Sequence, residues 1–168
     1  GSTLILASDP DADRLAVAEK DADGTWHLLT GNDIGVLLGH WQWVKFCEEN
    51  EARPEGERIP ASDVYMMAPA VASKMLAAVA DAHGFNFEET LTGFKWAGFR
   101  ADALRAEGKT VLFAYEPEIG FCIGDVVKDK DGIAAAAVFA EMALFAHREG
   151  QTVRERLHSL RETYGHFV

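Results

Sequence analysis

The segment 9–14, of sequence DPDADR, places carboxylates at Asp9, Asp11 and Asp13 and a guanidinium at Arg14. It lies between two short apolar runs, so we expect a turn between strands. Alternate residues of a turn can point to the same side, so the three aspartates could present oxygen atoms to one hard cation such as Mg²⁺ or Ca²⁺. Such an ion keeps coordination positions open for a phosphate, which Arg14 could bind through paired hydrogen bonds. The segment therefore predicts a cation site with room for a phosphate.

Two other interpretations of this segment compete with a phosphate-accepting cation site. An EF-hand loop also begins with alternating carboxylates, but it requires Gly at its sixth position and a bidentate Glu at its twelfth. Arg14 and Lys20 stand at those positions, so an EF-hand is excluded. An acidic surface turn that binds nothing stays open on the motif alone, because short motifs also occur by chance.

Further polar groups follow the segments that we expect to be strands. Residues 92–95, Thr-Gly-Phe-Lys, open a helix, and the unpaired N–H groups and positive dipole end of a helix start attract anions. Residues 116–120 follow the next strand, where carboxylates could accept hydrogen bonds from sugar hydroxyls or accept a proton. Lys130 precedes another helix and could reach a phosphate. The plain alternatives are a solvated lysine, an acidic loop tip and a charged turn.

The histidines and tryptophans show no catalytic pattern. Six histidines are scattered without metal-ligand spacing, and no Ser-His-Asp or Cys-His arrangement is recognisable. We expect Trp41, Trp43 and Trp96 in the core rather than as stacking platforms.

Composition limits the class of protein. With 48% hydrophobic residues, 10 Phe and 4 Trp, the chain can build a genuine core, so disorder is excluded. Its 168 residues suit one domain, or one domain with a fragment of another. A net charge of −11 disfavours nucleic acids and anionic membranes as partners, although a local cation still permits a phosphate ligand. Cys47 and Cys122 fit neither a disulfide framework nor a zinc pattern and no signal peptide is visible, so we expect a cytoplasmic location.

The elements that must position these groups alternate between strands and helices. Strands are predicted at 3–8, 15–20, 26–29, 63–68, 85–91 and 109–115. Helices are predicted from a cap at Asn32 or Asp33, from Ala72 to Gly84, and at 95–107, 132–149 and 153–164, with a solvated loop at 48–62. This alternation predicts an α/β fold, a layered α/β/α domain with a mostly parallel mixed sheet. Ligands of such sheets gather at the carboxyl ends of strands, where the segments around Lys95 and Glu116 fall.

Together these segments resemble the α-D-phosphohexomutase superfamily, most closely its phosphoglucomutase-2-type phosphopentomutases and the related bacterial phosphoglucomutase/phosphomannomutase enzymes. Residues 9–14 match the family's Asp-x-Asp-x-Asp-Arg magnesium loop, and residues 91–96 resemble its Thr-Gly-Phe-Lys-Trp segment. Residues 115–121 resemble its sugar-recognition loop, and residues 128–132 its Lys-Asp-Gly stretch. Any one motif is weak, but four in the family's order across essentially the whole chain make the resemblance specific.

The resemblance implies a role for each matching residue. Asp9, Asp11 and Asp13 would bind Mg²⁺, and Arg14 would act catalytically by orienting a phosphate. The residues implied to bind the substrate are Thr92, Gly93, Lys95, Glu116, Glu118, Gly120 and Lys130. The parent enzyme would move phosphate within a phosphorylated hexose or pentose, through a sugar bisphosphate and a phosphoserine outside this chain.

The resemblance also implies a fragment of a four-domain enzyme. Residues 1–20 would end the second domain and carry the metal loop, with a tag remnant at 1–2. Residues 21–150 would form the third, sugar-binding domain, and 151–168 a linker helix toward the fourth. Without the serine and the other domains, the isolated chain is expected to be inactive as a mutase. A sugar 1,6-bisphosphate synthase of the same family and a non-catalytic cation-binding, sugar-phosphate-binding or interaction domain stay open as alternatives.

Two positions depart from the family pattern. The branch has Glu-Glu-Ala-Ile-Gly where this chain has Glu-Pro-Glu-Ile-Gly, so Pro117 and Glu118 replace Glu and Ala. Phe99 stands where Gly-Asn usually follows the Gly-Phe-Lys-Trp segment. Either change could alter sugar specificity.

Overall fold

The computed structural model describes residues 2–167 and divides their strands between two sheets. The first sheet is antiparallel and contains β1 (Leu4–Ala7), β2 (Ala16–Lys20) and β3 (Trp26–Leu28), in that order. The second contains β4 (Val64–Pro69), β5 (Asn86–Thr90), β6 (Thr110–Glu116) and β7 (Gly120–Ile123), in the order β5-β4-β6-β7. Strand β4 pairs in parallel with β5 and β6, and β7 is antiparallel to β6. The predicted mixed, mostly parallel sheet is confirmed for this second sheet.

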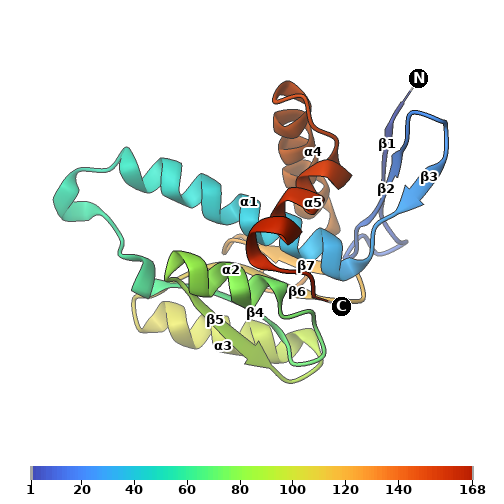
Figure 1. The fold of residues 1–168 in the computed structure, drawn as a ribbon. Helices are drawn as coiled ribbons and strands as arrows, with labels where there is room; N and C mark the ends of the chain where they lie inside the picture. Colours follow the sequence, from blue (N-terminus) through green and yellow to red (C-terminus); the bar gives the residue numbers. More distant parts are fainter. Residues whose placement is uncertain (1, 168) are drawn as a thin grey trace.

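Helices cover the second sheet on both faces. The helices within residues 2–167 are α1 (Gly31–Glu51), α2 (Met75–His83), α3 (Phe94–Ala106), α4 (Gly132–Arg148) and α5 (Val153–Tyr164), with 3₁₀ turns at Glu55–Glu57 and Ala61–Asp63, and α5 packs against α2 and α4. Helices α1 and α2 lie on one face and α3 lies on the other, so the predicted α/β/α layering is confirmed (Figure 1). No helix within residues 2–167 is both long and apolar enough to span a membrane.

Each face of the second sheet has its own hydrophobic layer. Successive strand residues point to opposite faces, so Met66 packs into the core shared with α1 and α2, whereas Met67 packs with α3. Helix α1 approaches the sheet closely at Gly35, where an added Cβ would lie 2.5 Å from the ring of Tyr115. Gly35, which has no Cβ, therefore allows α1 to pack closely against β6.

The start of α1 differs from the prediction. The predicted cap was Asn32 or Asp33, but the N-cap is Thr30, whose hydroxyl accepts a hydrogen bond from the Asp33 N–H. The Asp33 carboxylate accepts from the Thr30 N–H in return, which completes a capping box. Asn32 instead accepts from the Ser73 N–H and the Tyr115 hydroxyl, so it joins α1 to the sheet.

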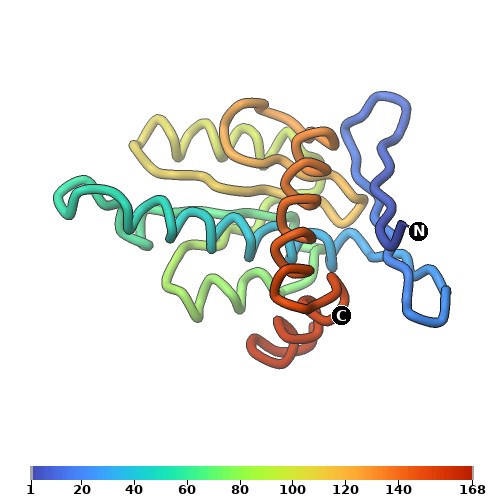
Figure 2. Tube along the Cα trace, turned by 90° about the horizontal axis from the view of Figure 1, so that it is seen from above, coloured from blue at the N-terminus to red at the C-terminus, as the bar shows by residue number. Residues whose placement is uncertain are grey.

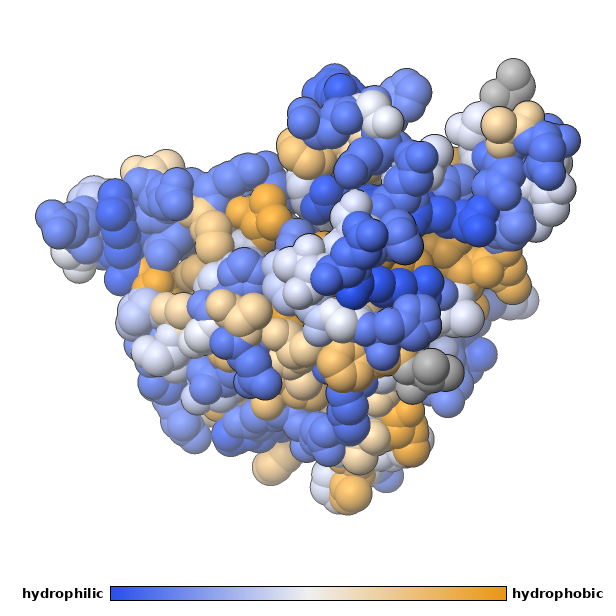
Figure 3. Space-filling model, viewed as in Figure 1, coloured by the Kyte–Doolittle hydropathy of each residue, from blue (hydrophilic) through white to orange (hydrophobic). Residues whose placement is uncertain are grey.

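Two further segments differ from the predicted secondary structure. Residues 48–51, predicted as loop, continue α1, and the projecting end of this helix carries mostly hydrophilic side chains (Figure 3). Residues 120–123 were not predicted as a strand but form β7, because the chain reverses tightly after Glu116 and pairs back on β6. The N-terminal sheet and the projecting end of α1 lie at opposite ends of the molecule (Figure 2).

Helix α5 is fastened to the first sheet by Glu19 of β2. The Glu19 residue is only 7% exposed, and its two carboxylate oxygens accept hydrogen bonds from the N–H groups of Val153 (2.7 Å) and Arg154 (2.8 Å). These N–H groups belong to the first turn of α5, where a negative charge also interacts favourably with the helix dipole. One hydrophobic core contains residues from both sides of positions 20 and 150. The predicted domain limits at these two positions stay a prediction.

We expect Glu19→Ala to lower the free energy of unfolding by about 2 kcal/mol, because two hydrogen bonds to a buried charge are lost. Urea denaturation of the folded chain measures this change. The matched control is Glu162→Ala on the same helix, an exposed carboxylate whose loss should change stability by less than about 0.5 kcal/mol. Equal effects of the two substitutions would show that Glu19 does not hold α5.

Candidate functional site

The acidic turn brings its three carboxylates together. One side-chain oxygen from each of Asp9, Asp11 and Asp13 lies within 4.8 Å of the others. Ala12 adopts a left-handed backbone conformation (φ 60°) and donates its N–H to the Asp9 carbonyl, which closes the turn. The Arg14 N–H donates to the Asp9 carboxylate at 3.2 Å. The three carboxylates therefore lie together, as their alternate spacing predicts.

The backbone of this turn is anchored on distant parts of the chain. The Gly132 N–H, at the start of α4, donates to the Ala12 carbonyl at 2.9 Å, and the Leu15 N–H donates to the Ile119 carbonyl at 3.0 Å. Arg14 also forms an isolated β-bridge with Gly120 at the start of β7. Residues 9–15 are thus held by the segments that carry Gly120 and Lys130, two of the other predicted site residues.

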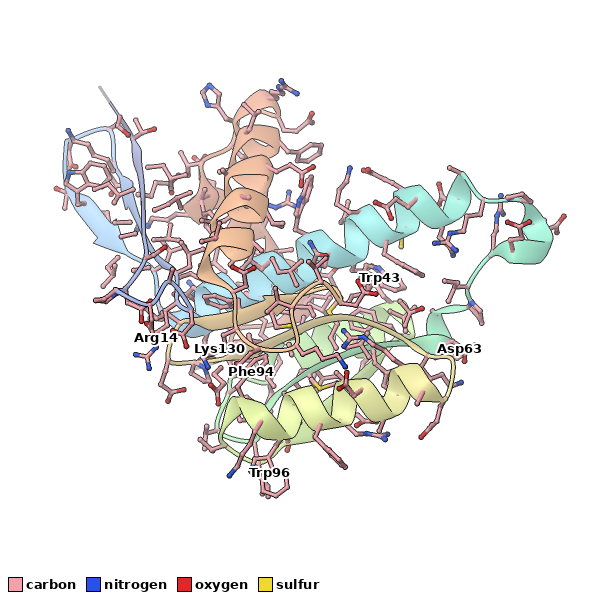
Figure 4. All side chains as sticks on the ribbon, turned by 180° about the vertical axis from the view of Figure 1, so that it is seen from behind. Arg14, Trp43, Asp63, Phe94, Trp96 and Lys130 are labelled. Atoms are coloured by element: carbon pink, nitrogen blue, oxygen red, sulfur yellow. The ribbon has the colours of Figure 1, made fainter. Side chains whose placement is uncertain are left out.

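Two cationic side chains, Arg14 and Lys130, border the carboxylates, and Figure 4 labels both. The Arg14 Nε lies 3.8 Å from Asp9 and 3.7 Å from Asp13, and its side chain is half exposed. The Lys130 Nζ lies 3.2 Å from Asp13 and 3.2 Å from Asp129, with its side chain only 17% exposed. The site therefore balances clustered negative charge with one exposed and one enclosed cation.

The pKa values follow this arrangement. Partial desolvation acts to raise the pKa of Asp9, but the hydrogen bond from the Arg14 N–H and the charge of the Arg14 guanidinium help to outweigh it, so the pKa lies below its ordinary value. Desolvation acts to lower the pKa of Lys130, but the carboxylates of Asp13 and Asp129 outweigh it and raise that pKa. Both side chains are therefore charged at neutral pH.

A second group of predicted residues lies at the carboxyl ends of β5 and β6. Glu116 ends β6, and its Oε1 accepts a hydrogen bond from the Gly93 N–H at 2.9 Å. Gly93 is the N-cap of α3 with φ 109°, a conformation that favours glycine. Glu116 therefore positions the segment that precedes Phe94 and Lys95.

The two groups meet at Phe94. Its ring centroid lies 5.3 Å from the Lys130 Nζ, so the start of α3 borders the cation that contacts Asp13. Phe94, Asp129 and Gly132 were not predicted as site residues. Asp129 and Gly132 lie within the Lys-Asp-Gly stretch, but their contacts with Lys130 and the acidic turn require the tertiary fold.

Three predicted residues stand apart from these contacts. Within residues 2–167, Thr92, Lys95 and Glu118 make no hydrogen bond or ion pair with the other predicted site residues. The Lys95 Nζ lies 5.5 Å from the ring centroid of Trp96 instead.

The prediction that Trp96 is a core residue is wrong, because α3 buries Phe94, Ala97, Ala101 and Leu104 and leaves Trp96 44% exposed on its outer side. Trp41 and Trp43 are buried as predicted.

A separate hollow of about 740 Å³ lies between the β2–β3 hairpin and α5. It is bordered by the ion pairs of Asp21 with Arg154 and of Asp33 with Arg161. None of the predicted site residues lines it. The candidate site is therefore the open surface where the acidic turn, the start of α4 and the start of α3 meet.

Comparison with known proteins gives a consistent family. Residues 46–164 match the family described as phosphoglucomutase/phosphomannomutase, alpha/beta/alpha domain III. The chain is 46% identical over 165 residues to a phosphopentomutase of Homo sapiens and 48% identical over 165 residues to a glucose 1,6-bisphosphate synthase of Mus musculus. Each alignment covers 98% of this chain and 26% of the relative, so the chain spans about a quarter of the length of these relatives.

Solved structures share the fold at low sequence identity. The N-acetylphosphoglucosamine mutase of Aspergillus fumigatus, in complex with GlcNAc-6P and magnesium, matches with a TM-score of 0.62 and 14% identity. This match covers 95% of the present chain and 35% of that chain. A variant of the same mutase, in complex with glucose 1,6-bisphosphate, matches with a TM-score of 0.61 and 14% identity, covering 96% of the present chain and 32% of that chain.

Proposed function

The chain belongs to the phosphoglucomutase/phosphomannomutase family, and from this premise we propose that it carries the cation-binding turn and the sugar-facing surface of a phosphosugar mutase. The observation that carries the proposal is the convergence of Asp9, Asp11 and Asp13 beside Arg14 and Lys130. The parent enzyme would transfer phosphate within a phosphorylated pentose or hexose. A relative named phosphopentomutase supports this substrate class.

Mg²⁺ fits the chemistry of the donor set. Carboxylate oxygens are the ligands that this hard cation prefers, and three of them within 4.8 Å can share one ion while leaving positions for other ligands. When bound, the ion would neutralise charge that develops on the transferred phosphoryl group. Arg14, half exposed and next to two of the aspartates, would bind phosphate oxygens through its free N–H groups.

Glu116 would orient the sugar with only part of its carboxylate. Its Oε1 already accepts the Gly93 N–H, which leaves Oε2 for a sugar hydroxyl. Lys95 is free to bind a phosphate because it rests on the exposed Trp96 ring rather than on a carboxylate. Thr92, Gly93, Glu118, Gly120 and Lys130 would border the same sugar phosphate.

A glucose 1,6-bisphosphate synthase is the second candidate, because a relative of that name is 48% identical to the chain. The same metal turn and sugar surface would serve both reactions, with a different phosphate donor in the synthase. Pro117 and Glu118, which depart from the mutase pattern, lie in the turn between β6 and β7 next to the sugar-orienting Glu116.

Titration of the chain with Mg²⁺ in a calorimeter tests the metal site. We expect saturable binding, because the turn is anchored by residues of this chain, and we expect Asp11→Asn to weaken the affinity by about tenfold or more, or about 1.4 kcal/mol. Asp81→Asn, an exposed carboxylate on α2, is the matched control and should bind as the wild type does. Wild-type affinity in Asp11→Asn, or no binding by any of the three proteins, would contradict the proposal for this chain.

A further inference from the structure

We propose that Lys130 is a tethered cation that holds the acidic turn in its metal-binding shape and releases Asp13 when a divalent cation binds. This inference rests on the proposed function, since it concerns the same carboxylates. It assigns Lys130 a positioning role in addition to any contact with substrate.

Among residues 2–167, Lys130 is the cation that lies closest to the Asp13 carboxylate. Its Nζ lies 3.2 Å from the Asp13 Oδ2, within hydrogen-bonding distance, whereas the Arg14 Nε stays at 3.7 Å from Asp13 and 3.8 Å from Asp9. Lys130 is also the more enclosed of the two, at 17% against 50% exposed side chain. Because screening by water is weaker at the enclosed side chain, Lys130 contributes more than Arg14 to neutralising Asp13.

Packing fixes the lysine in this place. An added Cβ at Gly120 would lie 2.3 Å from the Lys130 Cδ, so the lysine stem crosses directly over the start of β7. Gly120 is bridged to Arg14, and the Phe94 ring lies 5.3 Å from the Nζ. The stem is thus held against the same backbone that anchors the acidic turn.

The aspartates need a counter-charge when no metal is bound. Three carboxylates within 4.8 Å repel one another, and this repulsion opposes the closed turn. Lys130 offsets part of it through Asp13 and so favours the closed turn before a metal arrives. A divalent cation that takes the Asp13 oxygens replaces this interaction with a stronger one.

Asp129 provides the second position of the lysine. Its Oδ1 already lies 3.2 Å from the Lys130 Nζ, and its side chain is 70% exposed. The ammonium group therefore keeps a carboxylate partner after it leaves Asp13. The exchange needs only a small shift of the Nζ between two acceptors that both contact it.

Thermodynamic linkage gives the proposal its signature. If Lys130 stabilises the metal-free chain more than the metal-bound chain, removing its charge must lower the stability of the metal-free chain more than that of the metal-bound chain, and the Mg²⁺ affinity must rise by the difference. We expect Lys130→Met to unfold several degrees below the wild type in EDTA, to bind Mg²⁺ about tenfold more tightly, and to regain most of the lost thermal stability in saturating Mg²⁺.

Two further variants separate charge from packing. Lys130→Arg keeps the charge and should bind Mg²⁺ within about twofold of the wild type. Lys128→Met is the matched control, because the Lys128 side chain is 74% exposed and its ammonium group pairs with Asp102 rather than with the turn. It should leave the Mg²⁺ affinity and the effect of Mg²⁺ on melting unchanged.

The outcomes distinguish this inference from the metal site itself. Calorimetry with MgCl₂ and thermal melts in EDTA or excess Mg²⁺ are performed on each folded variant. Weaker or unchanged Mg²⁺ binding by Lys130→Met, or tighter binding by Lys130→Arg as well, overturns the inference while the metal site stands. No Mg²⁺ binding by the wild type overturns both.

Discussion

Gly132→Ala is expected to push the acidic turn off the start of α4 and to lower the free energy of unfolding by about 3 kcal/mol. An added Cβ would lie 2.2 Å from the Arg14 carbonyl oxygen and 2.8 Å from that of Ala12. Both are backbone atoms, so no side-chain rotation relieves the clash. The hydrogen bond from the Gly132 N–H to the Ala12 carbonyl would be strained or lost as the turn moves away.

Urea denaturation and calorimetric Mg²⁺ titration measure the two consequences. The carboxylates should lose their shared geometry with the anchor, so Mg²⁺ affinity should fall together with stability. Gly56→Ala is the matched control, because a Cβ at Gly56 meets nothing within 4 Å and no change is expected. Wild-type stability and affinity in Gly132→Ala would show that the turn does not depend on α4.

The helices and strands that could be predicted are those determined by the sequence of their own residues. Strand β6 and helix α2, which ends at the left-handed Gly84, follow from runs of apolar residues and from glycine at a helix end. Strand β7 could not be predicted, because its four residues are defined by pairing with β6 rather than by their own sequence. Trp96 was misplaced for a similar reason: its large apolar side chain favours burial, but the helical phase set by Phe94 and Ala97 turns it outward.

The candidate site divides in the same way. The three aspartates converge because they occupy alternate positions of one turn, where alternate side chains can point to the same side. The Lys130–Asp13 contact joins residues that are far apart in the sequence and depends on how β7 and α4 pack against the turn. The Glu116–Gly93 hydrogen bond likewise depends on the sheet, because it joins the end of β6 to the segment after β5, on the two sides of β4. The residues of the candidate site could therefore be predicted from the sequence, whereas the contacts among them required the fold.

The stability of the chain is expected to fall by about 2 to 3 kcal/mol between pH 6.5 and pH 4 because of His40 alone. His40 lies on α1, and burial, together with the positive charge of Arg156 and the neighbouring His83, lowers its pKa from 6.5 to about 4. The His40 Nδ1 is buried and finds no hydrogen-bond partner among residues 2–167, so no carboxylate compensates a proton on the ring. In the unfolded chain His40 takes up a proton below about pH 6.5, whereas in the folded chain it does so only near pH 4.

The sign follows from which state binds the proton. Between these pH values the unfolded chain carries more protons than the folded chain, so stability is full above pH 6.5 and falls as the pH drops toward 4. Urea denaturation across this range should therefore show a shallower pH dependence for His40→Leu than for the wild type. His147→Leu, which removes an exposed ring on α4, is the matched control and should keep the wild-type slope. The His40 ring lies between α1, α2 and α5, 6.4 Å from the ring of His83 and 5.9 Å from that of Tyr164. An unchanged slope in His40→Leu would mean that solvent reaches the His40 ring despite this packing.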